Sequence, residues 1–411
     1  MLRKLSIMGF IAMALDTAPV LAAEEFNGPN FLFNGFGTLG VVHSSEDKAD
    51  FASNFLKPNG AGYTRAWSAD VDSRLGGQVT AILTDQLSAV LQGISEQRYD
   101  NTYRPIIEWA NLKYKITPDF SVRAGRIALS TFLAADYRKV GYAIPWVRPP
   151  VEVYGLVPIS NSDGVDLAYR LHIAEATNTT QASYGQTKLR DDVSTINVKN
   201  LFGFANTTEI GPAMMRFSYM RAHITGDYST AFFDGFRQFG PEGNAIAAKY
   251  DINNKLTTFV GLGGSYDPGK WFLMAEWSKE NTHSILGANT GWYASSGYRF
   301  GRFTPYLTYA HVRLDSNKSD PGLTTASLPP ASAAAAASLN AALNSVLGSN
   351  AAQKTISAGV RWDFAKNIAL KLQYDHIRLA AGSQGTLINA QPDFQRGGKV
   401  NVFTTVLDFV F

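Results

Sequence analysis

Charged side chains recur at every second position of several short segments, which places the charge on one face of an extended chain. Between Trp67 and Thr84 the odd positions carry no charge, whereas the even positions include Asp70, Asp72 and Arg74. Such side chains are costly against lipid but cheap against water, where rings of one sign can act on passing ions. The candidates for this role on alternating tracks are Arg74, Arg123, Arg170, Arg361 and Lys371.

The elements that position these residues are predicted to be long strands. The same alternation runs through Gln353 to Phe364 and Ile368 to Ile377. These segments exceed the usual strand length of about five to six residues and match the ~9–11 residues of a tilted membrane strand. Aromatic residues gather at the ends of the apolar tracks, as in interfacial girdles. They are Trp67, Tyr114, Phe120, Trp271, Phe300, Phe303, Trp362 and Phe364.

Short and long connections alternate between the strands, which indicates an antiparallel sheet. Sixteen strands are predicted, starting near Phe31, Trp67, Leu87, Pro105, Phe120, Asp163, Asn178, Asn197, Ala213, Thr257, Trp271, Thr290, Phe303, Gln353, Ile368 and Val400. Because lipid offers no hydrogen bonds to an open edge, the sheet must close. The fold class is therefore all-β, a transmembrane antiparallel β-barrel with short periplasmic turns and long extracellular loops.

Composition narrows the function classes. The chain has 411 residues, a net charge of +3 and no cysteine, so disulfides and thiolate metal sites are excluded. The small net charge gives no reason to expect nucleic acid as a partner. Mean hydropathy lies close to zero, as expected for a wall that is apolar on one side only.

The first residues match a secretory signal peptide. Arg3 and Lys4 precede an apolar stretch from Leu5 to Leu15, and cleavage is expected after Ala22 or Ala23. A membrane anchor is the alternative, but this stretch is too short to span a bilayer as a helix. The predicted domains are a signal peptide, residues 1–22, and a barrel, residues 23–411.

Four segments resemble general, non-specific porins of the Gram-negative outer membrane. They are Phe33 to Gly40, Asp72 to Gly76, Tyr298 to Tyr306, and the last strand from Val400 to Phe411, which closes on a terminal Phe. The resemblance implies a sixteen-stranded barrel that forms a homotrimer and is narrowed by a long third loop folded into the lumen. It also implies passive diffusion of ions and small hydrophilic solutes, without a cofactor.

The third loop is predicted at Ala128 to Ser162. Its stretch from Tyr142 to Pro150 is too apolar and proline-rich for a purely solvated loop, although an extracellular loop packed against a neighbour remains the alternative. The loop contributes the constriction candidates Asp136, Arg138, Lys139, Arg148 and Glu152. Several of these are basic, so an acidic, cation-preferring constriction is not carried over from the family. Arg74, Arg123 and Arg170 are predicted to form a basic wall opposite the loop, giving a weak anion preference; for each, a general solvated lumen residue is the alternative.

Three other motifs carry no predicted chemistry. Gly35 to Gly40 matches G-x-G-x-x-G but lacks the following helix that dinucleotide binding needs, so close packing, at a trimer contact for example, is the better interpretation. Asp315 to Asp320 lacks the Gly and closing Glu of a calcium loop. The Ala-rich stretch from Ala331 to Ala352 is expected to be a short helix or a disordered tip in the seventh loop. No catalytic, metal or cofactor site is predicted.

The sequence therefore predicts an outer-membrane diffusion channel whose partners are ions, small solutes, outer-membrane lipid and lipopolysaccharide. A substrate-selective channel of similar architecture is the first alternative, although the mixture of acidic and basic residues on the inward tracks does not favour it. An outer-membrane enzyme and an adhesion barrel are the others. The six His residues show no recognisable catalytic spacing, which argues only weakly against the enzyme.

Overall fold

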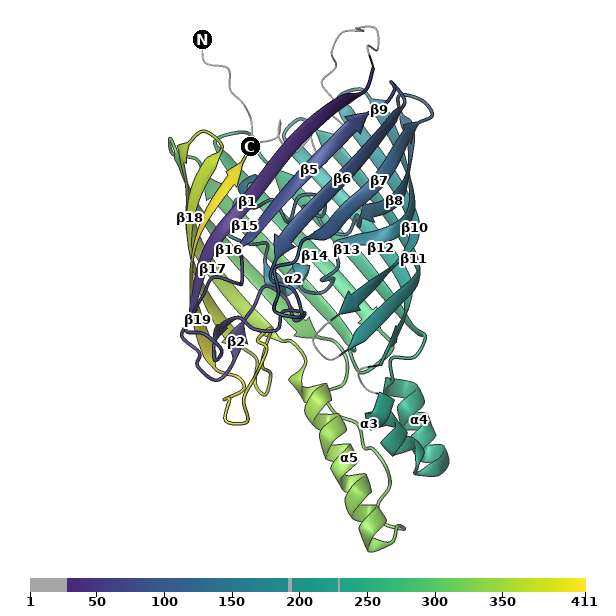
Figure 1. Cartoon of the computed structure of the whole chain (residues 1–411). Helices are drawn as coiled ribbons and strands as arrows, with labels where there is room; N and C mark the ends of the chain where they lie inside the picture. Colours follow the sequence, from purple (N-terminus) through teal and green to yellow (C-terminus); the bar gives the residue numbers. More distant parts are fainter. Residues whose placement is uncertain (1–27, 191–193, 228–229) are drawn as a thin grey trace.

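Sixteen long strands form one antiparallel sheet that closes into a barrel (Figure 1). The computed structural model describes residues 28–190, 194–227 and 230–411, and this count refers to them. The strands are β1 (Asn30–Ser44), β5 (Arg74–Ile82), β6 (Leu87–Glu96), β7 (Ile106–Lys115), β8 (Phe120–Ala128), β9 (Asn161–Ile173), β10 (Ala176–Arg190), β11 (Thr195–Ile210), β12 (Ala213–Gly226), β13 (Lys255–Tyr266), β14 (Trp271–Thr282), β15 (Ala288–Tyr298), β16 (Phe303–Leu314), β17 (Gln353–Ala365), β18 (Ile368–Leu379) and β19 (Lys399–Val410). The predicted closed all-β barrel is confirmed.

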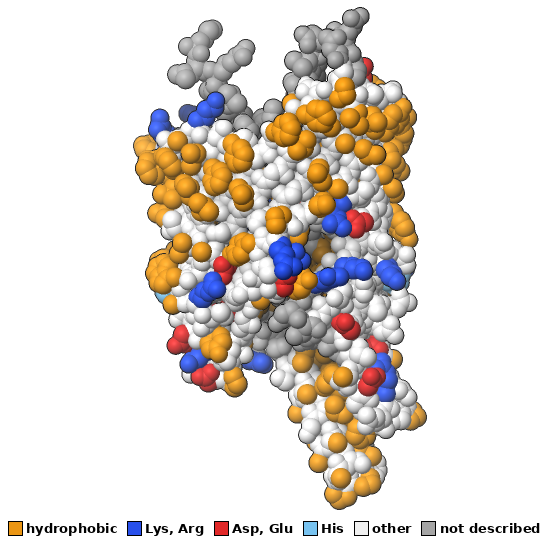
Figure 2. Space-filling view, viewed as in Figure 1, with side chains coloured by type: hydrophobic (Ala, Val, Ile, Leu, Met, Phe, Trp, Pro, Cys, Tyr) orange, Lys and Arg blue, Asp and Glu red, His pale blue; other side chains and the backbone are white. Residues whose placement is uncertain are grey.

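Alternation along each strand separates the two faces of the wall. In β1, Leu39 and Val41 are exposed on the outer face, whereas the alternate residues Thr38, Gly40 and Val42 are buried on the inner face. Figure 2 shows hydrophobic side chains spread over the outer wall of the barrel. This apolar outer surface suits contact with lipid, while polar side chains can face the interior.

The two ends of the barrel differ. One end carries tight turns at 83–86, 116–119, 174–175, 211–212, 267–270, 299–302 and 366–367. The chain enters β1 and leaves β19 at this short-turn end, and the long loops lie at the opposite end (Figure 1). The predicted signal peptide, residues 1–22, lies outside the described residues. Among the described residues, no helix has the length and apolar character that a helical membrane crossing requires.

The long loops contain the smaller elements. These are β2 (Asp50–Phe51), β3 (Ala61–Gly62), β4 (Trp67–Ser68), η1 (Gly141–Ala143), α2 (Val151–Tyr154), α3 (Thr230–Arg237), α4 (Gly240–Tyr250) and α5 (Pro330–Ser349). Helices α3, α4 and α5 project together from the barrel (Figure 1). Lys249 Nζ lies 2.7 Å from an Asp320 oxygen and joins the loop before β13 to the loop before β17. The helix alternative for the Ala-rich stretch is thereby confirmed, although α5 is long rather than short.

The barrel closes between β1 and β19. Gly35 N donates to Phe411 O at 2.8 Å, and Phe411 N donates to Gly35 O at 2.9 Å. A Cβ atom added to Gly37 would lie 2.3 Å from Phe409 Cζ, because the Phe409 ring covers this glycine on the outer face. Close packing of the glycine motif is therefore found within one chain, at the seam of the barrel.

The predicted second strand differs from the observed one. The other fifteen predicted starts lie within two residues of the observed strands, but the strand expected from Trp67 is interrupted. Residues 67–68 form β4, the chain then turns, and β5 begins at Arg74. Asp70 and Asp72 in this turn form ion pairs with Arg65 and Arg148, respectively. These aspartates alternate with apolar residues in the sequence, but they do so in a turn and not in a strand.

Candidate functional site

The loop between β8 and β9, residues 129–160, lies against the inward-facing side chains of β14 to β19; it is called the lumen loop below. Trp146 anchors its middle, with Nε1 donating to Ser295 Oγ at 2.8 Å and to Thr308 Oγ1 at 3.1 Å. The indole is 1% exposed and meets the Tyr293 ring edge-on. The apolar stretch of this loop is thus packed against the barrel wall.

Lys371 on β18 holds the loop by its backbone. Its Nζ donates to the carbonyl oxygens of Gly141, Ile144 and Trp146 at 2.7, 2.8 and 2.8 Å. Asp408 on β19 supplies the opposite charge at 2.8 Å, and both side chains are fully buried. Hydrogen bonds from a charged donor are stronger than neutral ones, so one lysine fixes a whole turn of the loop.

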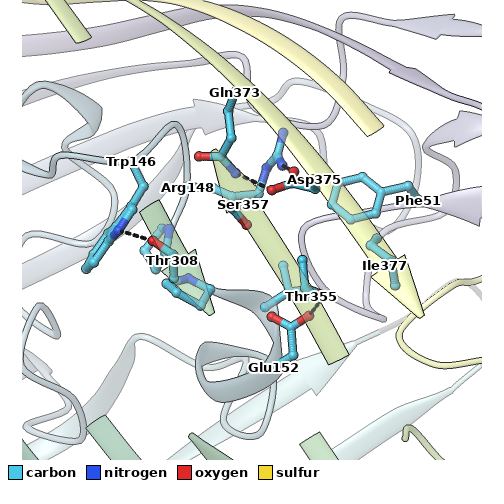
Figure 3. Close-up of a pocket in the computed structure, with 13 residues that line it drawn as sticks. Phe51, Trp146, Arg148, Glu152, Thr308, Thr355, Ser357, Gln373, Asp375 and Ile377 are labelled. Atoms are coloured by element: carbon cyan, nitrogen blue, oxygen red, sulfur yellow. Dashed lines mark hydrogen bonds and ion pairs between the residues drawn. The ribbon is translucent and has the colours of Figure 1, made fainter. Parts of the chain in front are cut away.

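Two arginines add to this attachment. Arg361 on β17 donates through Nη1 to Tyr142 O at 2.6 Å and to Ile144 O at 3.2 Å. Arg148 of the loop forms two hydrogen bonds with Asp72, at 2.9 and 2.6 Å. It also lies 3.4 Å from Asp375, as Figure 3 shows. A buried arginine is tolerated here because a two-pronged carboxylate contact compensates the lost hydration.

Buried carboxylates complete the attachment. Glu276 on β14 accepts hydrogen bonds from Leu133 N, Tyr154 Oη and Tyr293 Oη at 2.8, 2.6 and 2.7 Å. Burial and the neighbouring Glu276 raise the pKa of Tyr154, so this hydroxyl stays protonated and can donate. Glu152 in α2 accepts from Gln353 at 2.7 Å and from Thr355, as Figure 3 shows for the latter.

Six of the ten predicted constriction residues are buried rather than open to the lumen. They are Asp136, Arg138, Arg148, Glu152, Arg361 and Lys371. Asp136 lies 3.8 Å from Arg216, and Arg138 donates to Val157 O at 3.2 Å. The pore-lining interpretation of these residues is replaced by a structural one, since each binds the lumen loop to itself or to the wall.

The other four predicted residues remain partly exposed. Arg74, Arg123 and Arg170 lie on β5, β8 and β9, on the face opposite the outward-pointing apolar residues of these strands. Arg123 binds Asp166 through two hydrogen bonds at 2.9 and 2.5 Å and keeps 19% of its side chain exposed. Lys139 of the lumen loop forms an ion pair with Glu96 on β6.

A fifth basic residue of this region, Lys57, was missed by sequence reasoning. It lies in the loop between β2 and β3, where no periodicity marks it, and its Nζ donates to Gln97 O at 2.5 Å. Burial lowers the pKa of Lys57 to about 8, with Lys139 and Arg74 adding repulsion and Glu96 opposing the shift. The sequence contains only an indirect indication of this position, because Lys57 precedes Pro58 in a loop that is long enough to fold inward.

The described residues offer little for a metal site. Across residues 28–190, 194–227 and 230–411, no group of three or more acidic or His side chains could hold an ion. In the stretch set aside as a calcium loop, Asp315 binds Arg313 at 3.0 Å and Asp320 binds Lys249. These carboxylates are therefore used by ion pairs.

A closed barrel with charged inner walls and a loop packed inside it is the architecture found in porins. The family model of Gram-negative porins matches residues 161–382, more than half of the chain, and the chain belongs to this family. The family and the fold place the protein in the outer membrane. No curated protein matches the chain.

Solved structures share the fold at low sequence identity. The outer membrane channel DcaP of Acinetobacter baumannii is 12% identical with a TM-score of 0.58, over 93% of this chain and 98% of that chain. Salmonella typhi OmpF in complex with daunomycin is 13% identical with a TM-score of 0.55, over the same shares. OmpT of Vibrio cholerae in its trimer form is 10% identical with a TM-score of 0.52, over 94% of this chain and all of that chain.

Proposed function

We propose that the protein is a diffusion channel for ions and small hydrophilic solutes, with a weak preference for anions. One observation carries this proposal: the lumen loop covers the wall from β14 to β19, while the wall from β5 to β9 keeps partly exposed arginines. Solutes would pass between the loop and this second wall. The loop then limits the size of the solutes that pass, and the charged side chains opposite the loop favour solutes of one sign of charge.

The anion preference rests on which charges remain exposed. Arg361 and Lys371 are occupied by loop carbonyls and by Asp363 and Asp408, so they add little to the field felt by a solute. Arg74 on β5 and Arg123 on β8 keep part of their side chains exposed on the inner face. Lys139 shares Glu96 with Lys57, which leaves a small excess of positive charge at this level.

The orientation and the assembly rest on the same comparison with porins. The short turns would face the periplasm, and the long loops with α3, α4 and α5 would face outward, in contact with lipid and lipopolysaccharide. A secretory signal at residues 1–22 would direct export. The trimer form of Vibrio cholerae OmpT supports a homotrimer for this chain.

The proposal is tested by conductance of the purified protein in a planar bilayer with a salt gradient across it. Stepwise openings in groups of three, with a reversal potential of the sign that anions produce, are expected. A folded barrel that conducts nothing would refute the channel. A cation preference would refute the role given to Arg74, Arg123 and Arg170 but leave the channel intact.

A further inference from the structure

A cavity of about 600 Å³ lies on the long-loop side of the lumen loop. Its floor includes residues 151–152 and 155–159 of the lumen loop, and its sides are the long-loop ends of β11 to β14 with parts of the loops before β5, β17 and β19. This space is called the outer chamber below. It has the size of a typical binding pocket for a small organic molecule.

The wall of the outer chamber is mostly apolar, which a passage for hydrophilic solutes does not require. Val198 on β11 is paired with Ile224 on β12, and Met220 on β12 is paired with Phe259 on β13, all on the inner face. Leu156 and Ile159 of the lumen loop line the same space. An apolar surface of this extent facing a lumen indicates a site for an apolar group.

Two carboxylates border this apolar wall. Glu280 on β14 is directly opposite Phe259 in the sheet, so a carboxylate continues the row begun by Met220 and Phe259. It accepts hydrogen bonds only from neutral groups, Thr282 Oγ1 at 2.5 Å and Asn289 Nδ2 at 3.3 Å. Glu152 likewise binds only Gln353 and Thr355. In the described part of the chain, neither carboxylate forms an ion pair.

Lys57, the basic residue among the described residues that line the outer chamber, does not pair with Glu280 or Glu152. Lys57 lies at the opposite side, where Glu96 is the carboxylate that acts on it most strongly. Glu280 is therefore a carboxylate without a basic partner among the described residues, in an apolar neighbourhood, which suits a cation carried on an apolar body.

We propose that the outer chamber binds amphipathic amines, with the ammonium group at Glu280 and the apolar body against Met220 and Ile224. The ammonium group supplies the missing positive charge, and the body displaces water from the apolar wall. At the opposite side of the chamber the bound cation would face Lys57 and the nearby Arg74, which repel it. Such a molecule is held in the outer chamber and hinders the flow of other ions, an effect that rests on the proposed channel function.

Binding is tested by isothermal titration calorimetry of the detergent-solubilised protein, which requires no current. The probes are 2-phenylethylammonium, ethylammonium with the same charge but no ring, and 3-phenylpropionate with the ring but the opposite charge. Only 2-phenylethylammonium is expected to bind measurably. Equal binding of 3-phenylpropionate would overturn the role of the carboxylates, and equal binding of ethylammonium would overturn the role of the apolar wall.

Substitutions locate the site. Glu280→Gln keeps the shape and is expected to weaken 2-phenylethylammonium binding roughly tenfold, as for loss of a hydrogen bond to a charged group. Ile224→Asn is expected to weaken it as well, whereas Ile224→Val and the distant Glu242→Gln should not. Unchanged binding in Glu280→Gln would overturn the proposal, even if Ile224→Asn fails to fold.

Bilayer recordings separate this inference from the channel itself. The probe added on the long-loop side should interrupt the current at lower concentration than the probe added on the other side. A conducting channel that binds no 2-phenylethylammonium refutes the chamber inference alone. Calorimetric binding to a barrel that does not conduct supports the chamber and refutes the channel.

Discussion

Lys371 Nζ and Asp408 Oδ2 lie 2.8 Å apart, and neither side chain is exposed to solvent. Removing one partner of such a pair leaves an uncompensated buried charge, which costs about 3–5 kcal/mol. The N–H groups of Lys371 donate to three carbonyl oxygens of the lumen loop. This pair therefore connects the stability of the wall to the position of the loop.

We expect Lys371→Met to release the lumen loop while the barrel still forms. The three carbonyls lose their donor and Asp408 loses its counter-charge, so the loop should move from the wall and change single-channel conductance. The measurement is single-channel conductance in a planar bilayer. Lys371→Met combined with Asp408→Asn should regain part of the lost thermal stability, because the unpaired carboxylate is gone. Lys366→Met, in an exposed turn, serves as the control and should conduct as the parent does.

The inner arginines should set the sign of selectivity. Replacing Arg74, Arg123 and Arg170 by Gln removes three positive charges and leaves Asp166 without its partner, so the reversal potential in a salt gradient should move toward the value for cations. Arg126→Gln is the matched control, since Arg126 binds Asp163 on the outer face at 2.7 Å. An equal shift in the control would show that the effect does not come from the lumen.

Lys57 should make selectivity depend on pH. Its pKa of about 8 lies below the ordinary value of 10.5, so its charge is lost as the pH rises from about 7 to about 9. The anion preference should fall over this interval. The free energy of unfolding should rise with pH over the range from about 8 to 10.5. Folding disfavours the charged form of Lys57, so the destabilising effect of this charge is full below pH 8 and disappears as the pH approaches 10.5.

Two substitutions at Lys57 check this assignment. Lys57→Arg keeps a charge at every accessible pH, so the reversal potential should lose its pH step but keep its sign. Lys57→Gln should lose the step and part of the anion preference. A step that persists in both variants would assign the titration to another group.

The seam of the barrel offers a test of packing. Gly37→Val would push a side chain into the Phe409 ring, and overpacking of this kind costs about 1–3 kcal/mol. We expect a lower thermal unfolding midpoint in detergent. Gly77→Val is the matched control, because nothing lies within 4 Å of a Cβ atom at Gly77. A similar loss in both variants would show that valine is harmful on this face whatever its neighbours.

Strand positions were predictable because alternation is a local property of the chain. The turn at Ala174 and Glu175 was harder, since Ala174 has a φ of 51° without the Gly or Asn that usually marks such a turn. Helix α3 was missed although Phe232, Phe233 and Phe236 follow helical spacing. That pattern is too short to be distinguished from a loop without α4 and α5 beside it.

The candidate site was predictable in place but not in detail. The apolar, proline-rich stretch around Trp146 predicted a packed segment, and Trp146 is buried against the wall. Which of its charges stay exposed depends on contacts such as Arg148 with Asp72, separated by 76 residues, and Glu152 with Gln353, separated by 201. No local pattern encodes such pairs, so buried attachment residues and partly exposed ones looked alike in the sequence.

The surface that the lumen loop packs against includes residues on both sides of the junction between β1 and β19. A Cβ atom added to Gly141 would lie 2.1 Å from Asp408 on β19 and 2.5 Å from Thr38 on β1, and these two residues hydrogen-bond across 370 positions of the chain. Contacts so distant in sequence form late, because they order the most chain at once. Until the two strands meet, the loop has only part of its binding surface. A barrel caught before closure would thus lack both a sealed wall and a fully attached loop.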